Sequence, residues 1–291
     1  MAHELRQSYA NLVDAKLRAS LITKSLFNTK YEGVPTAGAV KIPVRDGEVS
    51  VGDYSTTNIG SNAVSYGSTQ YLTAVIDADK FVDEYIDGYE ADAVPDNLVA
   101  DRLESAGYSL ANGMDTQALT TLVNACEGKD KNGTSFATGD VRKGKTGTKI
   151  VASASIFDDI VDLGVAMDNA MVPADGRWLV VTAEAYGELV KSDDFIKQSN
   201  LSQELVMSGA VGMIAGFAIY KCPKLKTIKS TFKAIGGHSL FCTRIEAWKV
   251  EPKLIDGNGD ANVVGGSFIK GRKIYTHEVT KPHAFAYIAT A

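Results

Sequence analysis

Three glycines in the second half of the chain have a spacing that could serve phosphate binding. Gly209, Gly212 and Gly216 would let a backbone loop approach an anion closely. Their spacing matches neither the dinucleotide-binding pattern GxGxxG nor the P-loop pattern GxxxxGKS/T, and no lysine follows them. We therefore interpret them as turn glycines.

A polar stretch near the C-terminus resembles the start of a calcium-binding loop. Asp256, Asn258 and Asp260 alternate as the oxygen ligands do in such loops. Ala261 stands where the turn glycine is needed, however, and Ser267 stands where a bidentate glutamate is needed. We interpret the stretch as a polar turn, with one weakly bound surface ion as the alternative.

The other reactive side chains form no recognisable constellation. The histidines are too few and too scattered for a metal cluster; they are His3, His238, His277 and His283. No GxSxG nucleophile elbow occurs, which leaves only a Ser–His–Asp set brought together by the fold itself. The sequence therefore predicts no catalytic residues, no cofactor and no metal site.

The cysteines and the overall composition indicate a soluble protein from a reducing cytoplasm. Cys126, Cys222 and Cys242 form no CxxC pair, so we expect buried, reduced thiols rather than disulfides or zinc ligands. The 291 residues are 45% hydrophobic and 22% charged, which allows a sizeable core in one large or two modest domains. A net charge of −5 argues against a broad basic surface for nucleic acid. No segment approaches the roughly 20 apolar residues of a membrane span, and residues 1–10 have no apolar signal core.

The N-terminal residues 3–27 carry apolar side chains at helical spacing and predict an amphipathic helix. Leu12 and Leu17 belong to this apolar set, and basic residues lie among its members. We interpret the helix as a packed or exchanged arm, with a helix on a membrane surface as the alternative.

Residues 33–76 form a β segment that is interrupted by glycines and carries few charges. Apolar residues alternate with other residues over 40–44, which predicts a half-buried strand, and a second strand is predicted at 71–76. Pro43 places the first strand at a sheet edge, and an exposed edge invites pairing with another chain. We expect this segment to lie on a neighbouring subunit, with an ordinary surface hairpin as the alternative.

A hairpin within this segment supplies most of the candidate contact residues. Asp46 and Gly47 signal its turn, because glycine accepts the positive φ that the turn needs. Val49 and Val51 resume the apolar alternation after the turn. The candidate contacts between subunits are therefore Val40, Lys41, Ile42, Asp46, Gly47, Val49 and Val51 in this segment, with Leu12 and Leu17 in the N-terminal helix.

The centre of the chain predicts one long helix. Residues 77–104 are rich in Asp and Glu and are expected to form a solvated face. Pro95 suits a first helical turn, and helical spacing continues to Cys126, which gives a helix of about 30 residues, or roughly 45 Å. Residues 127–148 predict an exposed loop at the main domain boundary.

Helices and strands alternate in the remainder of the chain, which is typical of an α/β layer. Ser155 is expected to cap a helix that ends at Asn169, and Thr182 is expected to cap a helix over Ala183–Lys191. Trp178 and Trp248 occur in apolar strand contexts and are expected in the core. Strands are predicted at 178–181 and 217–220, and within 232–251 and 268–288.

Several stretches, taken in order, carry a resemblance to one protein family. They are residues 28–33 and 38–43, residues 106–111 leading to Asp115, residues 177–182 with Tyr186, and residues 209–217. In this order and spacing the chain is similar to the major capsid proteins of tailed bacteriophages, whose Hong Kong 97-like fold is shared with encapsulins and with the capsid floors of herpesviruses. The stretches resemble, in turn, the junction between arm and extended loop, the spine helix, the strand–helix step of the axial domain, and the turn and strand that follow.

The resemblance implies an α+β phage capsid fold with four parts. In that family the extended β-hairpin loop lies over the adjacent subunit, and the axial domains gather around five-fold and six-fold positions. The parts would be an N-terminal arm (1–32), the extended loop (33–76), a peripheral domain with the long spine helix (77–148 and 263–291) and an α/β axial domain (149–262).

The resemblance also implies a major capsid, or coat, protein and not an enzyme. Such a subunit would self-assemble into pentamers and hexamers of an icosahedral phage head that encloses double-stranded DNA. It would belong to the virion after assembly in the cytoplasm of a host bacterium. Expected partners are further copies of the chain, a separate scaffolding protein and a portal, with a decoration protein left open, and neither specific nucleic-acid binding nor membrane contact is expected.

Some relatives cross-link covalently through a lysine of the extended loop. Lys41 is the only lysine in the loop proposed for this chain. Nothing in the sequence identifies a partner residue for it, so we assign no cross-link.

Three other interpretations stay open. The nearest is an encapsulin-type nanocompartment shell, which would enclose an enzyme cargo. An α/β enzyme with an unrecognised site would instead have a discrete pocket that holds a catalytic group with a perturbed pKa. A tail or decoration protein is disfavoured by the long helix together with the α/β layer.

Overall fold

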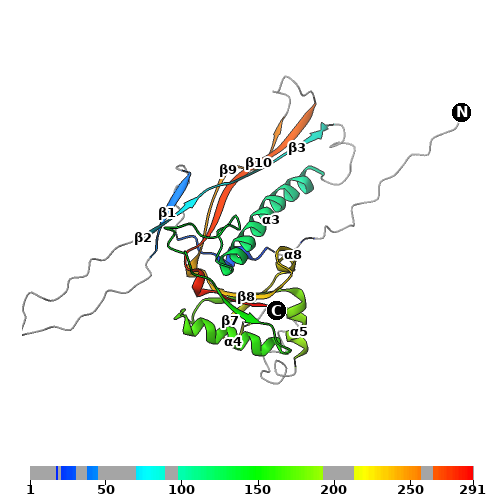
Figure 1. Cartoon of the computed structure of the whole chain (residues 1–291). Helices are drawn as coiled ribbons and strands as arrows, with labels where there is room; N and C mark the ends of the chain where they lie inside the picture. Colours follow the sequence, from blue (N-terminus) through cyan, green and yellow to red (C-terminus); the bar gives the residue numbers. More distant parts are fainter. Residues whose placement is uncertain are drawn as a thin grey trace, which may run out of the picture.

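The computed structural model contains two β-sheets linked by a long helix, with a two-stranded ribbon beside them (Figure 1). It describes residue 18 and residues 21–30, 38–44, 70–88, 98–192, 213–256 and 265–290. None of the helices within these residues combines the length and the apolar character needed to cross a membrane.

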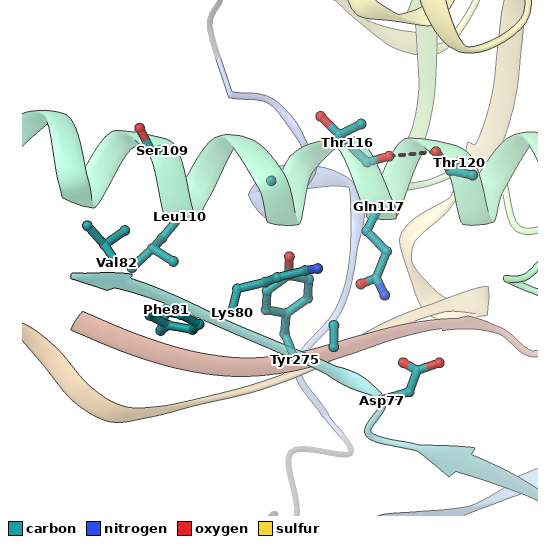
Figure 2. A pocket seen from close by; sticks show the side chains of 12 residues that line it. Asp77, Lys80, Phe81, Val82, Ser109, Leu110, Thr116, Gln117, Thr120 and Tyr275 are labelled. Carbon is teal, nitrogen blue, oxygen red and sulfur yellow. Dashed lines mark hydrogen bonds between the residues drawn. The ribbon is translucent and has the colours of Figure 1, made fainter. Parts of the chain in front are cut away.

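The first sheet has three antiparallel strands in the order β3-β10-β9. Their bounds are Ala78–Asp87 for β3, Cys242–Asp256 for β9 and Gly266–Val279 for β10. Helix α3 (Leu98–Cys126) packs along one face of this sheet (Figures 1 and 2). Because successive strand residues point to opposite faces, Ile86 and Ile269 turn toward the helix and form a small apolar cluster with Ala106.

The predicted long helix is confirmed as α3, which has 29 residues and spans about 44 Å. Strand β3, by contrast, lies in the acidic stretch that the sequence indicated only as a solvated face. Its inward-facing apolar residues are Ala78, Val82 and Ile86, since Lys80 and Glu84 occupy the inward positions between them. Apolar residues four apart do not display the period of two that identifies a strand.

The second sheet has six strands in the order β4-β11-β8-β5-β7-β6 and mixes parallel with antiparallel pairs. In Figure 1, α4 (Ile156–Asn169) and α5 (Ala183–Lys191) lie on one side of this sheet, and the C-terminal end of α3 lies toward the other side with α8 (Lys224–Ile228). The strands are β4 (Thr148–Val151), β5 (Arg177–Val181), β6 (Met213–Ile214), β7 (Phe217–Lys221), β8 (Phe232–His238) and β11 (Ala286–Ala289).

The local signals read from the sequence of this layer are confirmed. At the start of α4, the Ser155 side chain accepts a hydrogen bond from the backbone N–H of Asp158 at 3.4 Å. At the start of α5, Thr182 Oγ1 accepts one from the backbone N–H of Ala185 at 3.2 Å. Trp178 of β5 lies in the main core, and all three cysteines are free and buried.

Strand pairing divides the chain differently from the domain ranges predicted from the sequence. Strand β9, which follows the short 3-10 turn η2 (Ser239–Phe241), falls within 149–262 but pairs with β10. Strand β11, which follows the turn η4 (Pro282–Ala284), falls within 263–291 but pairs with β8 and β4. The sheet to which a strand belongs depends on pairing partners that lie far away in the chain. Local sequence patterns therefore do not reveal it.

Trp248 corrects a second prediction, because its side chain is 40% exposed rather than part of the core. The residue lies on β9, which is an edge strand of the three-stranded sheet. The Nζ atom of Lys273 lies 4.4 Å from the centroid of its indole ring. Lys273 lies opposite Trp248 on β10 and covers the ring from the inner side of the sheet, and the outer side of this edge strand leaves the ring partly exposed.

Two glycines in β8 let other elements approach the six-stranded sheet closely. A Cβ atom at Gly236 would lie 2.4 Å from Leu163 Cδ2 of α4. A Cβ atom at Gly237 would lie 2.4 Å from Phe285 Cε1 and 2.7 Å from Trp178 Cη2. Both faces of β8 are thus packed so closely at these positions that no space remains for a Cβ atom.

We expect Gly237→Ala to lower the free energy of unfolding by about 1–3 kcal/mol, because the added methyl group overlaps two aromatic rings. The matched control is Gly107→Ala in the middle of α3, where an added Cβ meets no atom within 4 Å. This control should instead raise the free energy of unfolding by about 0.5–1 kcal/mol. Urea titrations of both variants and the unchanged chain measure the two shifts, and a neutral Gly237→Ala would contradict the close packing at β8.

Candidate interaction surfaces

The two-stranded ribbon consists of β1 (Ala39–Val44) and β2 (Gln70–Val75), which pair antiparallel along their full length. One face of the ribbon packs on the chain itself. Four side chains of this inner face form a cluster with Ile245 of β9, and Val141 packs against that cluster. The four are Ile42, Val44, Leu72 and Ala74.

The outer face of the ribbon carries exposed apolar side chains. Tyr71 is 59% exposed and Val75 is 49% exposed. Pro43 lies opposite Tyr71 in the register, and Lys41 lies opposite Thr73. Since residues two apart on a strand share a face, these side chains form one continuous surface.

The structure separates the candidate contact residues into three groups. Lys41 lies on the outer face and keeps its candidacy, whereas Ile42 is fully buried within its own chain and Val40 packs against the same inner cluster. Side chains alternate between the two faces along β1, and the even-numbered positions face the body of the chain. Val40 and Ile42 therefore point inward. Tyr71 and Val75, which sequence reasoning did not name as candidates, share the outer face with Lys41, as their strand register with β1 shows. The remaining candidates lie outside the described residues: Leu12, Leu17, Asp46, Gly47, Val49 and Val51.

A groove of about 620 Å³ lies between α3 and β3 (Figure 2). Ser109 and Gly113 are the small helix residues along it, and the ring of Tyr275 reaches from β10 toward Gly113. Phe81, which is 73% exposed, lies beside the groove on the edge strand β3. The groove therefore combines apolar and charged residues of β3, such as Val82 and Lys80, with polar helix residues such as Gln117.

A cluster of buried charges lies where the ribbon meets the three-stranded sheet. Arg142 donates to Glu278 at 2.8 Å and to Asp140 at 2.9 Å, and its guanidinium lies 4.5 Å from the centroid of the Phe136 ring. Burial raises the pKa of Glu278 above its usual value, although the charges of Arg142 and Lys131 act in the opposite direction. Both cations come from residues 127–147, which we call the connecting loop.

Asp115 of α3 joins three elements at one buried carboxylate. Its Oδ1 accepts hydrogen bonds from the backbone N–H groups of Ile22 and Thr23, at 3.2 and 3.1 Å, and from Thr23 Oγ1 at 2.8 Å. Its Oδ2 lies 2.9 Å from Nζ of Lys224 on α8. The short helix α1 (Thr23–Leu26) is thereby tied to α3, while most of the helix predicted over 3–27 lies outside the described residues.

His277 of β10 is fully buried beneath α3. Its Nδ1 lies 3.0 Å from Oε1 of Gln117, and its ring meets Phe27 edge to face with centroids 5.1 Å apart. Burial lowers the pKa of His277 to about 3, and the charge of Arg244 contributes in the same direction. The imidazole is therefore neutral near neutral pH and serves packing.

The other residues considered for chemistry are held by ordinary structural contacts. His238 Nδ1 accepts a hydrogen bond from the backbone N–H of Leu240 at 3.1 Å, beside the turn at Gly176. Gly216 has a φ of 81° between β6 and β7, which confirms a turn glycine, whereas Gly209 and Gly212 lie outside the described residues. Asp256 ends β9 opposite Ser267 of β10, whereas Asn258, Asp260 and Ala261 lie outside the described residues. Within the described part of the chain, no group of three or more His, Cys, Asp or Glu side chains is placed to hold a metal ion.

Comparisons with known proteins identify the fold. No protein-family model matches the sequence, and no curated protein matches it. The structure is similar to a solved chain of Mycobacterium phage Che8, at 18% identity and a TM-score of 0.71 over 98% of this chain and 97% of that one. It is similar to the capsid structure of the cyanophage P-SCSP1u, at 15% identity and a TM-score of 0.73 over 99% and 93%. It is also similar to the capsid of an empty GTA particle, at 13% identity and a TM-score of 0.67 over 99% and 95%.

These similarities extend over nearly the whole of each chain, so the fold is that of phage capsid proteins. The fold class expected from the resemblance is confirmed at this level, as a mixed helix-and-sheet capsid fold. Identities of this size say nothing about individual residues, so each contact surface has to be argued from its own geometry.

We expect the stability of the protein to fall as the pH drops from about 6.5 toward about 3. In this window His277 binds a proton in the unfolded chain but not in the folded one, so each pH unit removes at most about 1.4 kcal/mol from the free energy of unfolding. His277→Gln removes this contribution and should flatten the pH dependence. Urea titrations of both proteins across the window measure it.

Other groups titrate in the same range and are common to both proteins. Burial lowers the pKa of His283, which acts in the same direction as His277, whereas the raised pKa of Glu278 acts in the opposite direction. The difference between the two proteins therefore isolates His277. Equal pH slopes would show that His277 is not a neutral, buried group.

Proposed function

We propose that this chain is the major capsid subunit of a tailed-phage-type particle. It would self-assemble into the pentamers and hexamers of an icosahedral head that encloses double-stranded DNA. The observation that carries the proposal is the likeness in fold to phage capsid chains over 98–99% of this chain. The exposed apolar face of the ribbon supports it, because such a face gains stability when a second molecule covers it.

The contact that we propose is made head to tail between copies. The outer face of the ribbon, with Tyr71 and Val75, lies on the neighbouring copy along its groove between α3 and β3. Phe81 at that groove supplies an exposed ring for the apolar part of the contact. A contact between two different patches generates a ring where the rotation closes, which is how pentamers and hexamers would arise. Each interface is expected to bury about 1,200–2,000 Å² in total.

The two sheets correspond to the two domains of the proposed subunit. The three-stranded sheet with α3 is the peripheral domain, and α3 is its spine helix. The six-stranded sheet with α4 and α5 is the axial domain. This assignment follows the strand pairing, so β9 belongs to the peripheral domain and β11 to the axial domain.

The proposal extends to partners that the fold does not itself identify. A separate scaffolding protein and a portal would take part in assembly inside the host bacterium, and a decoration protein would be an optional addition. The encapsulin and enzyme alternatives are decided by the same assembly experiments, since an encapsulin shell would hold protein cargo and an enzyme would form no shell.

We expect the double variant Tyr71→Asp with Val75→Asp to stay folded and to form no shells, because charge on the outer face opposes burial on a neighbour. Phe81→Asp should fail in the same way from the groove side. Electron microscopy of the purified chains, with and without a co-expressed scaffolding protein, provides the measurement. The control Val165→Ser changes an exposed apolar residue of α4 and should leave assembly unchanged.

Mixing the two kinds of variant sharpens the test. Each retains one intact half of a head-to-tail contact, so a mixture should form dimers but no closed rings. Normal shells from the Tyr71 and Val75 double variant would remove the ribbon from the proposed interface.

We expect purified subunits to show no measurable binding to double-stranded DNA at about 0.15 M salt, because the net charge of the chain is −5 and phosphate binding needs a basic surface. A gel-shift titration over a range of salt concentrations measures this. Tight binding that weakens steeply with salt would contradict the proposal that the subunits enclose DNA without binding its phosphates.

A further inference from the structure

The ribbon joins the body of the protein through a short link. Ile76 and Asp77 are the two residues between β2 and β3. On the side of β1, the backbone N–H of Ile76 donates to the carbonyl oxygen of Gly38 at 2.9 Å, which closes the end of the ribbon. The direction of the ribbon relative to the three-stranded sheet therefore depends on what holds this link, together with the packing of its inner face on Ile245.

One ammonium group from the connecting loop bridges the link and the sheet. Nζ of Lys131 donates to the carbonyl oxygen of Val75 at 2.6 Å and lies 3.0 Å from Oδ1 of Asp77, both on the ribbon side. It also donates to Thr276 Oγ1 of β10 at 2.9 Å. An ammonium group has three N–H donors, so these three acceptors use all of them. The Lys131 side chain is only 9% exposed and that of Asp77 is 38% exposed, so the bridge is partly shielded from water.

The turn that carries Lys131 is itself firmly built. Asp130 Oδ1 accepts hydrogen bonds from the backbone N–H groups of Asn132 and Thr134, at 3.0 and 2.8 Å. The side chain of Asn124, near the end of α3, donates to the carbonyl oxygen of Lys131 at 3.3 Å. Hydrogen bonds from α3 and within the turn thus fix the backbone at Lys131, which restricts the positions that its ammonium group can reach.

A second contact from the connecting loop reaches the same ribbon. Val141 packs against the inner apolar cluster of the ribbon, next to Arg142, which is paired with Glu278 of β10. Glu278 Oε1 also lies 3.7 Å from Nζ of Lys131. Removing the lysine would leave the carbonyl group of Val75 and the partly exposed carboxylate of Asp77 without this donor, whereas Glu278 would keep its pair with Arg142. The link would then move toward water.

We propose that Lys131 is a positioning residue that sets the direction of the β1–β2 ribbon relative to the three-stranded sheet. The consequence of this role for assembly rests on the proposed function. In a shell, the direction of the ribbon would fix where its outer face meets a neighbouring copy. The inference about the single chain stands on the contacts of Lys131 alone.

Spin labels on the unassembled full-length chain test the positioning directly. Cysteines replace Thr73 on the outer face of β2 and Ser109 on α3, both of them exposed, while the three native cysteines are buried. We expect one narrow distance distribution in the otherwise unchanged chain, and a distribution about twofold wider in Lys131→Met, because the ribbon then samples several directions. An unchanged narrow distribution in Lys131→Met would overturn the proposal.

The matched control is Lys129→Met in the same turn. Lys129 pairs with Glu127 at 2.7 Å and forms no hydrogen bond or ion pair with the described residues of the ribbon, so its loss should leave the distribution narrow. If Lys131→Met is not recovered as a folded protein, Asp77→Asn decides the question. It keeps the shape of the link while removing one charge of the bridge, and a distribution as narrow as that of the control would overturn the proposal.

Electron microscopy of the same variants separates this inference from the proposed function. Shells of uniform diameter from the unchanged chain and of mixed diameter from Lys131→Met support both. A broadened distribution without shells from any variant would leave Lys131 as a positioning residue and overturn the capsid assignment. Uniform shells from Lys131→Met, with an unchanged distribution, would overturn the positioning role and leave the capsid assignment in place.

Discussion

One helix takes part in three separate apolar clusters, and the arrangement of the molecule depends on it. Near its start, α3 places Ala106 against Ile86 and Ile269, and in its middle it places Met114 against Tyr275. Its last turns enter the main core of the six-stranded sheet with Leu119 and Leu122 among others. Because a helix of 29 residues bends little, the two sheets hold a set distance and angle. The buried carboxylate of Asp115 also connects α1 and α8 to α3.

At its root the ribbon is held by charges as well as by the apolar contacts of Ile76, and this has a physical reason. The link between β2 and β3 ends in backbone carbonyl groups and an aspartate, which would be unfavourable against an apolar surface. Lys131 from the connecting loop satisfies these groups with a hydrogen bond as well as charge, and Arg142 of the same loop pairs with Glu278 of β10. The apolar part of the ribbon, around Ile42, can then pack on Ile245 without burying unpaired polar groups.

Sequence reasoning succeeded where the signal was local. The caps at Ser155 and Thr182, the long helix and the core strand at Trp178 all follow from residues within one turn or one strand, and the order of such stretches pointed to the capsid fold although no family model matches the sequence. It failed where partners lie far apart in the chain. The pairing of β9 with β10 and the exposure of Trp248 depend on sheet edges that only the fold creates. The role of Lys131 depends on Thr276, which lies 145 residues away.

The inner packing of the ribbon has a consequence for the proposed assembly of copies. A segment that already rests on its own chain through Ile42 and Leu72 has lost most of its conformational freedom before any neighbour arrives. Association then loses less entropy than the ordering of a free arm would require. Each contact can therefore be weak and still suffice, and weak contacts break and re-form. Growth by reversible steps allows a misplaced copy to leave before the next copies enclose it.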